Sequence, residues 1–458
     1  MNIDYNILNG KKHIHFIGIG GSGMYPLAQI LFKKGYFLTG SDNNTGDTLD
    51  AVKKMGIEVF LGHDEKNIEG ADLIVHSAAI MKDNPELLAA EKNGIPTIER
   101  SILLGIVTSW YKNAVCVCGT HGKTTTSSMI TQIYLEAGRD PTTVIGGKLK
   151  LIGGSGRVGK GEDMVCEACE YVDTFLKLSP DVAVLLNIDS DHLEYFKTLD
   201  NLKASFRKFC DMATDFVVYN GDDEDSVSAL SGIDKKTVTF GLKNTNDYYA
   251  ENISSQVQLE SHSLVTSFDL YSKGQMLGTI SLSIPGKHNV FNALAAAATA
   301  LETGILFKDI KKALLEFKSA DRRFDVLGIV NGVTIADDYA HHPTELEATL
   351  KAATSLGFKN VWAVFQPFTF SRTAMLLDDF ARVLKIADKV VLTPIMGSRE
   401  INTFGIDSKD LQNKLEGSVL LNTFEDVASF IKENAKDGDL VITLGCGDIY
   451  KAAKLMLK

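Results

Sequence analysis

The sequence predicts an α/β protein of three domains, from its length, its alternating strand and helix patterns, and two glycine-rich turns. Its 458 residues exceed what one hydrophobic core normally serves. Each glycine-rich turn, at Gly18 to Gly23 and at Gly119 to Gly122, stands between an expected strand and an expected helix. We place the domains at residues 1–112, 113–319 and 320–458.

The composition is that of an ordinary globular protein, with 45% hydrophobic and 23% charged residues. The net charge of -11 and the lack of a basic run argue against nucleic acid as a partner. No secretion signal is visible and no apolar run approaches the ~20 residues of a membrane helix. We therefore expect a cytoplasmic protein without membrane insertion. The six cysteines lack the spacing of a zinc site and are expected to be reduced and packed.

The first domain is expected to be a small parallel α/β unit. Ile14 to Ile19 is predicted to form a buried strand, and Tyr25 to Lys34 a helix that ends before Gly35. Further strands are expected at Tyr36 to Thr39 and Asp72 to His76. Residues 109–113 are a plausible linker to the next domain.

The turn Gly18-Ile-Gly20-Gly21-Ser22-Gly23 fits the dinucleotide fingerprint GxGxxG and predicts a Rossmann-like domain. Its glycines permit a tight turn and a close approach of a pyrophosphate to a helix N-terminus. Asp42 could accept a hydrogen bond from a sugar hydroxyl. A dehydrogenase is the obvious interpretation, but a second phosphate loop further along the chain favours a diphosphate-bearing substrate such as a nucleotide sugar.

The second domain opens with an expected strand at Ala114 to Cys118 and a helix through Glu136. The loop between them, Gly119-x-x-Gly122-Lys123-Thr124, is a shortened phosphate-binding loop and predicts a P-loop-type ATPase domain. In such a loop backbone N–H groups cradle phosphate, Lys123 neutralises phosphate oxygens, and the hydroxyl of Thr124 can bind magnesium.

The remainder of the second domain mixes two patterns. Strands are expected at Met164 to Glu167, Val182 to Ile188 and Phe216 to Tyr219, and an Ala-rich helix at Val290 to Thr303. Between Thr237 and Ile284 apolar and polar residues alternate with period two, which predicts an added antiparallel patch.

Carboxylates follow two of these expected strands. The segment Glu167-Ala-Cys-Glu170 comes after one strand, and Asn187-Ile-Asp-Ser-Asp-His192 comes after the next. Ligands bind at the carboxyl ends of parallel strands, so these groups are expected beside the phosphate loop. Carboxylates and an imidazole near a triphosphate predict magnesium binding.

The third domain is expected to begin near residue 320, where strict alternation of strands and helices returns. Its predicted strands are Thr334 to Ala336, Val361 to Phe365, Lys389 to Leu392 and Leu440 to Leu444. The pattern predicts a C-terminal Rossmann-like α/β domain.

Seven segments occur in the order found in one enzyme family: HFIGIGGSGM, CGTHGKTTT, NIDSDHLEY, PGKHNVFNALAA, DRRFD, DDYAHHPTE and LGCGDIY. Together they resemble the Mur ligases over essentially the whole chain. The resemblance implies a UDP-sugar domain, a central ATPase domain, and a C-terminal domain that brings the amino acid. It implies a ligase that uses ATP and Mg²⁺ to join L-alanine to the lactyl carboxylate of UDP-N-acetylmuramate through an acyl phosphate, as a monomer or homodimer.

The resemblance also implies roles for individual residues. Lys123 would bind phosphate, and Thr124, Glu170 and His192 would hold two magnesium ions. Asn289 and Asn292 would meet adenine, Arg323 the phosphates and Asp338 the ribose. The remaining nucleotide contacts would be Gly119, Thr120, His121, Gly122 and Thr125. The UDP sugar would meet Gly18, Gly20, Gly21, Ser22, Gly23, Ser41, Asp42 and Ser77.

The amino-acid site departs from the family pattern, because Phe368 and Thr369 stand where the family often has His and Arg. A guanidinium holds a carboxylate through two hydrogen bonds, so we assign the carboxylate of alanine to Arg372. The alternative is a surface arginine at the start of a helix that Ser371 caps.

A general base would help to deprotonate the amine, and His341 is the candidate. His342, which precedes a proline, is expected to cap a helix or pack. The nearest rival function is a sister ligase that joins a recycled murein peptide to the same UDP sugar. An NAD-dependent oxidoreductase and a non-catalytic nucleotide-binding protein are the alternatives from other classes.

Overall fold

The computed structural model describes residues 3–258, 263–318, 321–398 and 400–458. Two compact units are distinguished. The first comprises Met1–Ala250, Tyr271–Leu277 and Asn292–Ala313, and the second Glu251–Leu270, Gly278–Phe291 and Leu314–Lys458. The three domain spans inferred from the sequence stay predictions, and the boundary between 319 and 320 lies outside the described residues. Within the described part of the chain, no helix has the length and apolar character needed to cross a membrane.

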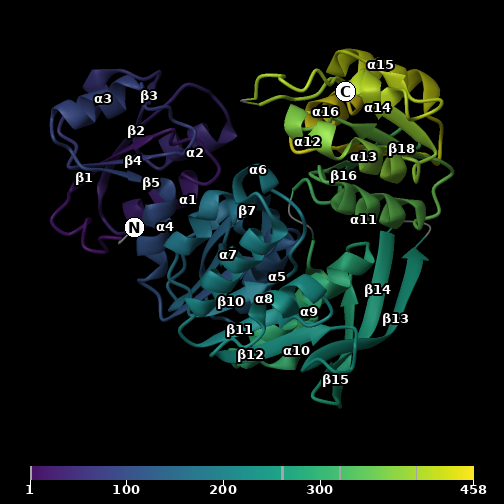
Figure 1. Ribbon diagram of the computed structural model, residues 1–458, viewed down its shortest axis with the longest axis horizontal. Helices are drawn as coiled ribbons and strands as arrows, with labels where there is room; N and C mark the ends of the chain where they lie inside the picture. Colours follow the sequence, from purple (N-terminus) through teal and green to yellow (C-terminus); the bar gives the residue numbers. More distant parts are fainter. Residues whose placement is uncertain (1–2, 259–262, 319–320, 399) are drawn as a thin grey trace. The chain divides into compact units, whose positions relative to one another are not determined.

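The first sheet is parallel throughout and has the strand order β3-β2-β1-β4-β5 (Figure 1). Its elements are β1 (His13–Ile17), α1 (Tyr25–Lys33), β2 (Phe37–Asp42), α2 (Asp47–Lys54), β3 (Glu58–Leu61), η1 (Glu65–Ile68), β4 (Leu73–His76), α3 (Pro85–Lys92), β5 (Thr97–Glu99) and α4 (Arg100–Thr108). The chain order reverses between β1 and β4, which is where open α/β sheets bind ligands. The predicted glycine turn follows β1 and therefore lies at this switch point.

Both faces of this sheet are covered, as the continuous apolar strands require. Leu73 and Val75 of β4 are buried in one cluster with Leu27 of α1. Ile74, which points to the opposite face, is buried with Ala89 of α3. Successive residues of a strand face opposite sides, so a strand that is buried on both faces needs an apolar run without alternation.

The central sheet has ten strands in the order β15-β14-β13-β12-β11-β10-β6-β9-β7-β8. Its strands are β6 (Asn113–Cys118), β7 (Thr142–Leu149), β8 (Gly154–Arg157), β9 (Asp163–Glu167), β10 (Val182–Leu185), β11 (Phe216–Asn220), β12 (Lys236–Gly241), β13 (Tyr248–Gln258), β14 (Ser263–Ser272) and β15 (Gln275–Leu282). Its helices are α5 (Lys123–Glu136), η2 (Lys150–Ile152), η3 (Tyr171–Lys177), α6 (Leu193–Phe196), α7 (Leu199–Asp211), α8 (Glu224–Leu230), α9 (Lys287–Glu302) and α10 (Phe307–Glu316). β6 lies between β10 and β9, all three parallel, so the segments after these strands meet at one edge.

The predicted antiparallel patch is confirmed, but it begins one strand later than expected. β14 and β15 are neighbours joined by two residues, a connection that only antiparallel strands allow. Cross-strand side-chain bonds follow this register, with Ser267 Oγ 2.8 Å from Ser281 Oγ and Thr279 Oγ1 donating to Asp269 Oδ1 at 2.6 Å. β12, which carries the first alternating segment, instead pairs in parallel with both of its neighbours.

The cysteines are free thiols, as expected. Cys116 of β6 and Cys166 of β9 are register partners with their sulfur atoms 3.3 Å apart in the core. Cys118 and Cys210 are also buried, whereas Cys169 is exposed. The prediction of packed thiols therefore holds for the three strand cysteines and for Cys210 of α7, is wrong for Cys169, and holds in part for the half-buried Cys446.

The third sheet has the order β16-β17-β21-β18-β19-β20. Its elements are β16 (Asp325–Val330), β17 (Val333–Asp338), α11 (Pro343–Thr354), β18 (Val361–Phe365), α12 (Phe370–Met375), α13 (Leu377–Leu384), β19 (Lys389–Leu392), α14 (Ser408–Gln412), β20 (Val419–Leu420), α15 (Phe424–Asn434), β21 (Leu440–Leu444) and α16 (Tyr450–Met456). All pairs are parallel except β16 with β17. The β16–β17 hairpin was not predicted, although Asn331-Gly332, with φ of 50° and 78°, is a common two-residue hairpin turn.

Helices cover both faces of the third sheet. On one face Ala363 and Phe365 of β18 are buried with Leu346 of α11. On the other face Trp362 and Val364 of the same strand are buried with residues of α15 and α16. The central strand is thus enclosed, and its carboxyl end, with those of β17 and β21, forms the edge that carries the predicted C-terminal site residues.

Candidate active site

The phosphate loop joins β6 to α5 and requires glycine at two positions. Gly119 has φ 134° and Gly122 has φ 88°, values that favour glycine. A Cβ on Gly119 would lie 3.0 Å from Cβ of Leu186, and one on Gly122 would lie 2.5 Å from Oδ1 of Asn292. Glycine at each position therefore permits both a backbone with positive φ and the close approach of a neighbouring side chain.

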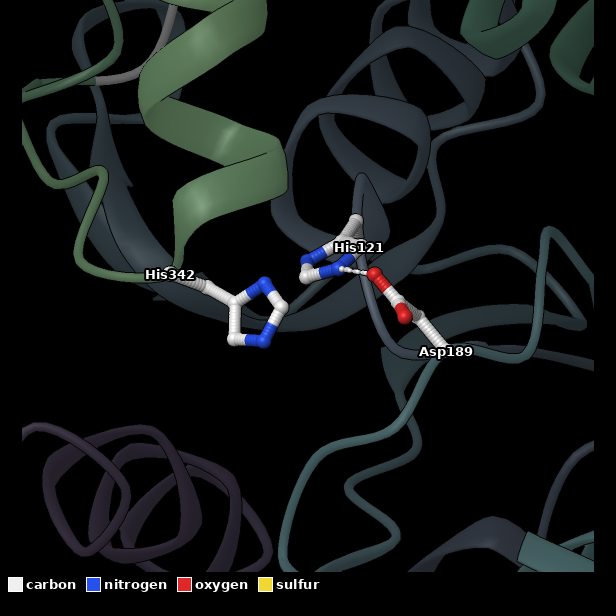
Figure 2. A group of neighbouring side chains, drawn as sticks. All are labelled: His121, Asp189 and His342. Atoms are coloured by element: carbon white, nitrogen blue, oxygen red, sulfur yellow. Dashed lines mark hydrogen bonds and ion pairs between the residues drawn. The ribbon is translucent and has the colours of Figure 1, made fainter. Parts of the chain in front are cut away.

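Residues that follow β10 hold the loop in place. The backbone N–H of His121 donates to Oδ1 of Asn187 at 2.8 Å, and Nδ2 of Asn187 donates to the carbonyl of His121 at 3.0 Å. Nε2 of His121 donates to Oδ2 of Asp189 at 2.9 Å (Figure 2). The backbone N–H of Asp189 donates to Oγ1 of Thr120 at 2.9 Å. The segment of Asn187 and Asp189 was expected beside the phosphate loop from its position after a strand, but no individual role was assigned to these two residues.

Lys123 begins α5, and its ammonium group turns back onto the loop. Nζ donates to the carbonyls of Gly119 at 2.6 Å and Thr120 at 3.0 Å, and to Oε1 of Glu170 at 3.0 Å. Burial is the largest single effect and lowers the pKa of Lys123, but the charges of Glu170, Cys169 and Glu167, with the hydrogen bond to Glu170, together raise the pKa above its ordinary value. The site therefore contains a fixed cation, as binding of phosphate oxygens requires.

Thr124 and two carboxylates lie at the same edge. The hydroxyl of Thr124 donates to Oε2 of Glu167 at 2.9 Å, and the backbone N–H of Gly146 donates to the same oxygen at 2.7 Å. Glu170 pairs with Lys123, and its side chain is 3% exposed. A hydroxyl and carboxylate oxygens are the ligands that Mg²⁺ prefers, so this donor set fits a magnesium ion. Glu167 was one of the carboxylates expected at this edge, although it was not among the ligands that the resemblance implied.

The ring of His192 packs against that of Tyr171, the residue that follows Glu170. His192 precedes α6 with φ 56°, and its ring centroid lies 4.8 Å from that of Tyr171. Val172 has φ 54°, which is unfavourable for a β-branched residue, and Asp173 has φ 56°. Tyr195 donates its hydroxyl proton to Oδ2 of Asp173 at 2.9 Å. Strained backbone beside Glu170 is thus held by contacts to the segment of His192.

The two predicted adenine residues lie on α9, one turn apart. Oδ1 of Asn292 accepts from Oγ1 of Thr126 at 3.2 Å, which ties α9 to the helix of the phosphate loop. Nδ2 of Asn289 donates to the carbonyl of Pro285 at 2.6 Å. Thr125, also predicted, is 9% exposed. The contacts of Asn289 and Asn292 with adenine stay predictions.

In the first sheet, Asp42 supports the glycine turn. Its Oδ2 accepts from the backbone N–H of Gly20 at 2.9 Å and its Oδ1 from that of Asn44 at 3.0 Å. Ser77 follows β4, and its Cβ lies 3.6 Å from where a Cβ on Gly18 would be. Asp42 and Ser77 thus flank the turn, and a sugar hydroxyl would share the oxygens of Asp42 with the backbone.

Ser41 lies behind the turn and is fully buried. Its carbonyl accepts from the N–H groups of Gly18 at 2.8 Å and Ile19 at 3.1 Å. Its hydroxyl donates to Oε2 of Glu86, a fully buried carboxylate, at 2.6 Å. The carbonyl of Ser41 therefore supports the turn and its hydroxyl binds Glu86 of α3, while its predicted contact with the substrate stays a prediction.

Arg100 was missed by the sequence analysis. It begins α4, and a Cβ on Gly23 would lie 2.9 Å from its Nη1. Oγ of Ser155 in β8 donates to the carbonyl of Ser22 in the same turn at 3.2 Å. A guanidinium beside a glycine turn suits a diphosphate. No motif marks this arginine, because only the fold brings α4 to the turn.

In the C-terminal sheet, the two neighbouring arginines have different contacts. Nε of Arg322 lies 2.9 Å from Oδ2 of Asp337, and its Nη2 donates to the carbonyl of Gly445 at 2.6 Å. The guanidinium carbon of Arg323 lies 5.2 Å from the ring centroid of Tyr339. Arg322 therefore joins β17 to the end of β21, and Arg323 lies beside the residue that follows β17.

Asp338 ends β17 and is 6% exposed. Its carboxylate accepts from the backbone N–H groups of Phe324 at 2.8 Å and Ala340 at 2.7 Å. Burial raises the pKa of Asp338 to about 6, and the charge of Arg323 offsets part of the rise. The group predicted to meet the ribose is therefore ionised above about pH 6.

This pKa predicts a measurable pH dependence of stability. An unfolded Asp titrates near ~3.9, so between about pH 4 and 6 the folded chain holds a proton that the unfolded chain has lost. The protonated side chain of Asp338 therefore contributes on the order of 2–3 kcal/mol to the free energy of unfolding. This contribution is complete below about pH 4 and is lost as the pH rises through about 6. Asp338→Asn should remove this dependence. The check is the melting temperature of both proteins from pH 4 to 7, and parallel profiles would contradict it.

His341 is oriented by two acceptors. Nδ1 lies 3.1 Å from the carbonyl of Tyr339 and 3.2 Å from Oε2 of Glu345. With the proton on Nδ1, Nε2 is the atom that would take a proton from an amine. His342 is the N-cap of α11, where its ring accepts from the backbone N–H of Thr344 at 3.4 Å. The expected capping role of His342 is confirmed.

Arg372 lies in the first turn of α12. The cap of this helix is Thr369, whose Oγ1 accepts from the backbone N–H of Arg372 at 3.4 Å. Ser371, the cap considered from the sequence, instead donates its hydroxyl proton to Oε1 of Glu400 at 2.5 Å. The expectation of a Ser371 cap is wrong because the helix begins one residue before Ser371, and Thr369 occupies the cap position.

Family models of the Mur ligases match the chain in three successive segments. The Mur ligase family catalytic domain matches residues 13–111, the Mur ligase middle domain residues 117–300, and the Mur ligase glutamate ligase domain residues 322–447. The first two segments contain the glycine turn and the phosphate loop, and the third contains Arg323, Asp338 and Arg372.

Curated relatives and solved structures agree with this assignment. The UDP-N-acetylmuramate–L-alanine ligase of Caldanaerobacter subterraneus subsp. tengcongensis is 44% identical over 464 residues, which cover 100% of this chain and 99% of the relative. That of Acetivibrio thermocellus is 43% identical, with 98% and 96% covered. The structure of the UDP-N-acetylmuramate-alanine ligase from Thermotoga maritima aligns with a TM-score of 0.83 at 27% identity, covering 98% of each chain. A murein peptide ligase from Psychrobacter arcticus aligns with a TM-score of 0.74 at 25% identity, with 97% and 98% covered. The chain belongs to the Mur ligase family.

Proposed function

We infer that the protein joins L-alanine to the lactyl carboxylate of UDP-N-acetylmuramate in an ATP-dependent step of peptidoglycan precursor synthesis. Relatives that are 40% to 44% identical over nearly the whole chain carry this activity in their names. The structural observation that carries the inference is the edge where β6, β9 and β10 end. There Lys123, Thr124 and two carboxylates gather around a loop built to bind phosphate.

A carboxylate and an amine do not condense in water, so the acid must first be activated. An oxygen of the lactyl carboxylate attacks the γ-phosphorus of ATP, the bond to the bridging oxygen breaks, and ADP leaves an acyl phosphate behind. Lys123 offsets the charge on the transferring phosphoryl oxygens. The neutral amine of alanine then attacks the acyl carbon, phosphate leaves with the bonding pair, and the proton of the amine passes to a base.

We propose that Thr124, Glu167, Glu170 and His192 bind magnesium at this edge. When bound, Mg²⁺ would supply positive charge to the phosphate oxygens of ATP. Glu170 is paired with Lys123 in the structure, so a ligand role would exchange this contact for one with the metal. Lys123 would keep its two carbonyl acceptors and remain positioned in the loop.

We propose that the UDP sugar binds at the glycine turn of the first sheet. The turn supplies backbone N–H groups at the start of α1, and Arg100 supplies a positive charge for the diphosphate. Asp42 and Ser77 stand on either side of the turn and could meet sugar hydroxyls. A cytoplasmic location, where ATP is available, fits this pair of substrates.

We propose that the C-terminal residues complete the two substrate sites. Arg323 would meet the phosphates of ATP and Asp338 its ribose, with Asn289 and Asn292 at the adenine. Arg372 would hold the carboxylate of alanine, and Nε2 of His341 would accept the proton of the amine. The three domain spans and a monomeric or homodimeric state belong to the same proposal.

ATP turnover is expected to require the sugar substrate, because the site activates a carboxyl group and not water. Phosphate release should be measured with ATP alone, with UDP-N-acetylmuramate added, and with alanine added as well. Equal rates of phosphate release in the three mixtures would contradict the proposal. Replacing alanine with a murein peptide tests the sister ligase, and full turnover with the peptide but not alanine would favour that rival.

A further inference from the structure

We propose a second ligand site at the amino edge of the first sheet, for a small molecule that carries a phosphate group on an aromatic or heteroaromatic ring. A cavity of about 730 Å³ lies there, lined among others by Lys11, Lys12, Lys34 and Trp110. Pockets of roughly 300–1,000 Å³ are typical of small-molecule sites. The cavity has the volume and the chemistry to hold such a ligand.

This cavity is separate from the glycine turn. Lys11 and Lys12 directly precede β1, whereas the turn directly follows it. The five residues of β1 span roughly 16 Å at ~3.3 Å per residue. The UDP sugar and the proposed ligand would therefore approach opposite edges of one sheet and need not compete.

The positive charge of the cavity is unusual for this chain, whose net charge is -11. Lys12 and Lys34 are exposed, and within the described part of the chain neither forms an ion pair with a carboxylate. Nζ of Lys34 lies 5.5 Å from the ring centroid of Trp110. Asp72, which directly precedes β4, accepts from the backbone N–H groups of Lys12 at 2.8 Å and His13 at 2.9 Å. These backbone bonds lower the pKa of Asp72, with a smaller contribution from Lys11. Asp72 does not line the cavity, whose described lining has three lysines and no carboxylate.

The aromatic side chains of the cavity favour a ring over a bare anion. Trp110 and Tyr36 are half-buried, and Phe37 is 60% exposed. Flat faces at such sites bind aromatic rings by stacking, and lysines near them bind phosphate as point charges. These groups line an open depression and not a protruding face, which favours a small ligand over a membrane surface.

The test uses the full chain and three small probes. Phenyl phosphate carries both features, inorganic phosphate only the charge, and benzyl alcohol only the ring. Binding is followed by calorimetry on the wild-type chain, and by the fluorescence of Trp110 in a Trp362→Phe background. Trp362 is the only other tryptophan, and it is 7% exposed with Nε1 donating to Asp439. Each titration is repeated with saturating ATP to separate this cavity from the phosphate loop.

Lys34→Gln is the diagnostic variant and Lys33→Gln its matched control. Both lysines are exposed at the end of α1, but Lys33 does not line the cavity, and its Nζ donates to the carbonyl of Val158 at 3.4 Å. Phenyl phosphate should bind saturably, about tenfold more tightly than inorganic phosphate. Lys34→Gln should weaken it about threefold to tenfold, and Lys33→Gln less than about twofold.

Several results would overturn the proposal. These are no saturable binding of phenyl phosphate, equal affinity for inorganic phosphate or benzyl alcohol, equal effects of the two glutamine variants, or loss of binding in saturating ATP. Binding to phosphatidylglycerol vesicles that depends on Lys34, without binding of phenyl phosphate, would assign the cavity to a membrane surface instead.

Discussion

Replacing Lys123 with alanine is expected to lower kcat by about 10²- to 10³-fold, or roughly 3–4 kcal/mol of transition-state stabilisation. The ammonium group is held by two loop carbonyls and one carboxylate, so it is already placed where phosphoryl charge would develop. The measurement is steady-state phosphate release at saturating ATP, UDP-N-acetylmuramate and alanine. A folded variant that keeps more than about a tenth of wild-type kcat, a loss below ~1.4 kcal/mol, would refute this role.

The same substitution is expected to lower stability, which calls for a control. Without Lys123 the carboxylate of Glu170, 3% exposed, has no cation beside it, and breaking such a pair costs about 3–5 kcal/mol. The double variant Lys123→Ala/Glu170→Gln should recover melting temperature without recovering activity. Lys112→Ala, which removes a 75% exposed lysine of a surface ion pair, should change neither.

Replacing Arg372 with alanine is expected to raise the KM for alanine by about 30- to 150-fold, or roughly 2–3 kcal/mol, the scale of a charge-assisted hydrogen bond. The physical reason is that the carboxylate of alanine would lose its guanidinium partner. The KM for ATP should change little, because other residues, and not Arg372, are the proposed contacts of the nucleotide. The measurement is steady-state kinetics with alanine varied at saturating ATP and UDP sugar.

Two variants sharpen this test. Phe368→His should cost much less than Arg372→Ala, since no charge is bound by the phenyl ring. Arg382→Ala removes a guanidinium from the next helix that is 59% exposed and paired with Glu347, and it should leave the KM for alanine unchanged. An unchanged kcat/KM for alanine in Arg372→Ala would return this residue to the surface role considered from the sequence.

Most of the strands could be predicted from local patterns. β18, β19 and β21 have the predicted bounds, because buried parallel strands are short apolar runs with clear polar boundaries. β12 shows why alternation alone does not predict whether a strand pairs in parallel or antiparallel. Its period-two pattern suggested an antiparallel strand, yet it pairs in parallel on both sides, since alternation reports how a strand is buried and not its direction.

Site residues could be predicted where they stand together in one sequence motif. They were harder to predict where the fold brings them together from distant parts of the chain. The loop from Gly119 to Thr124 is recognisable because phosphate binding needs neighbouring residues on one turn. Arg100 is not recognisable, since nothing in its local sequence says that α4 begins beside Gly23. Glu167 and Glu170 were both expected at this edge from the sequence, but only the structure shows that Thr124 contacts Glu167 and Lys123 contacts Glu170.

The sequence by itself determined the family, the α/β class and the order of the phosphate-binding segments, because glycine turns, apolar runs and short polar motifs are local requirements of the chain. The tertiary structure decided which carboxylate meets Thr124 and which meets Lys123. It also revealed that the hydroxyl of Ser41 donates to Glu86 and that its carbonyl accepts from the glycine turn. These outcomes depend on which strands are neighbours in the sheet. β6 lies between β9 and β10 although β7 follows it in sequence, and side-chain distances of about 3 Å are decided by that pairing.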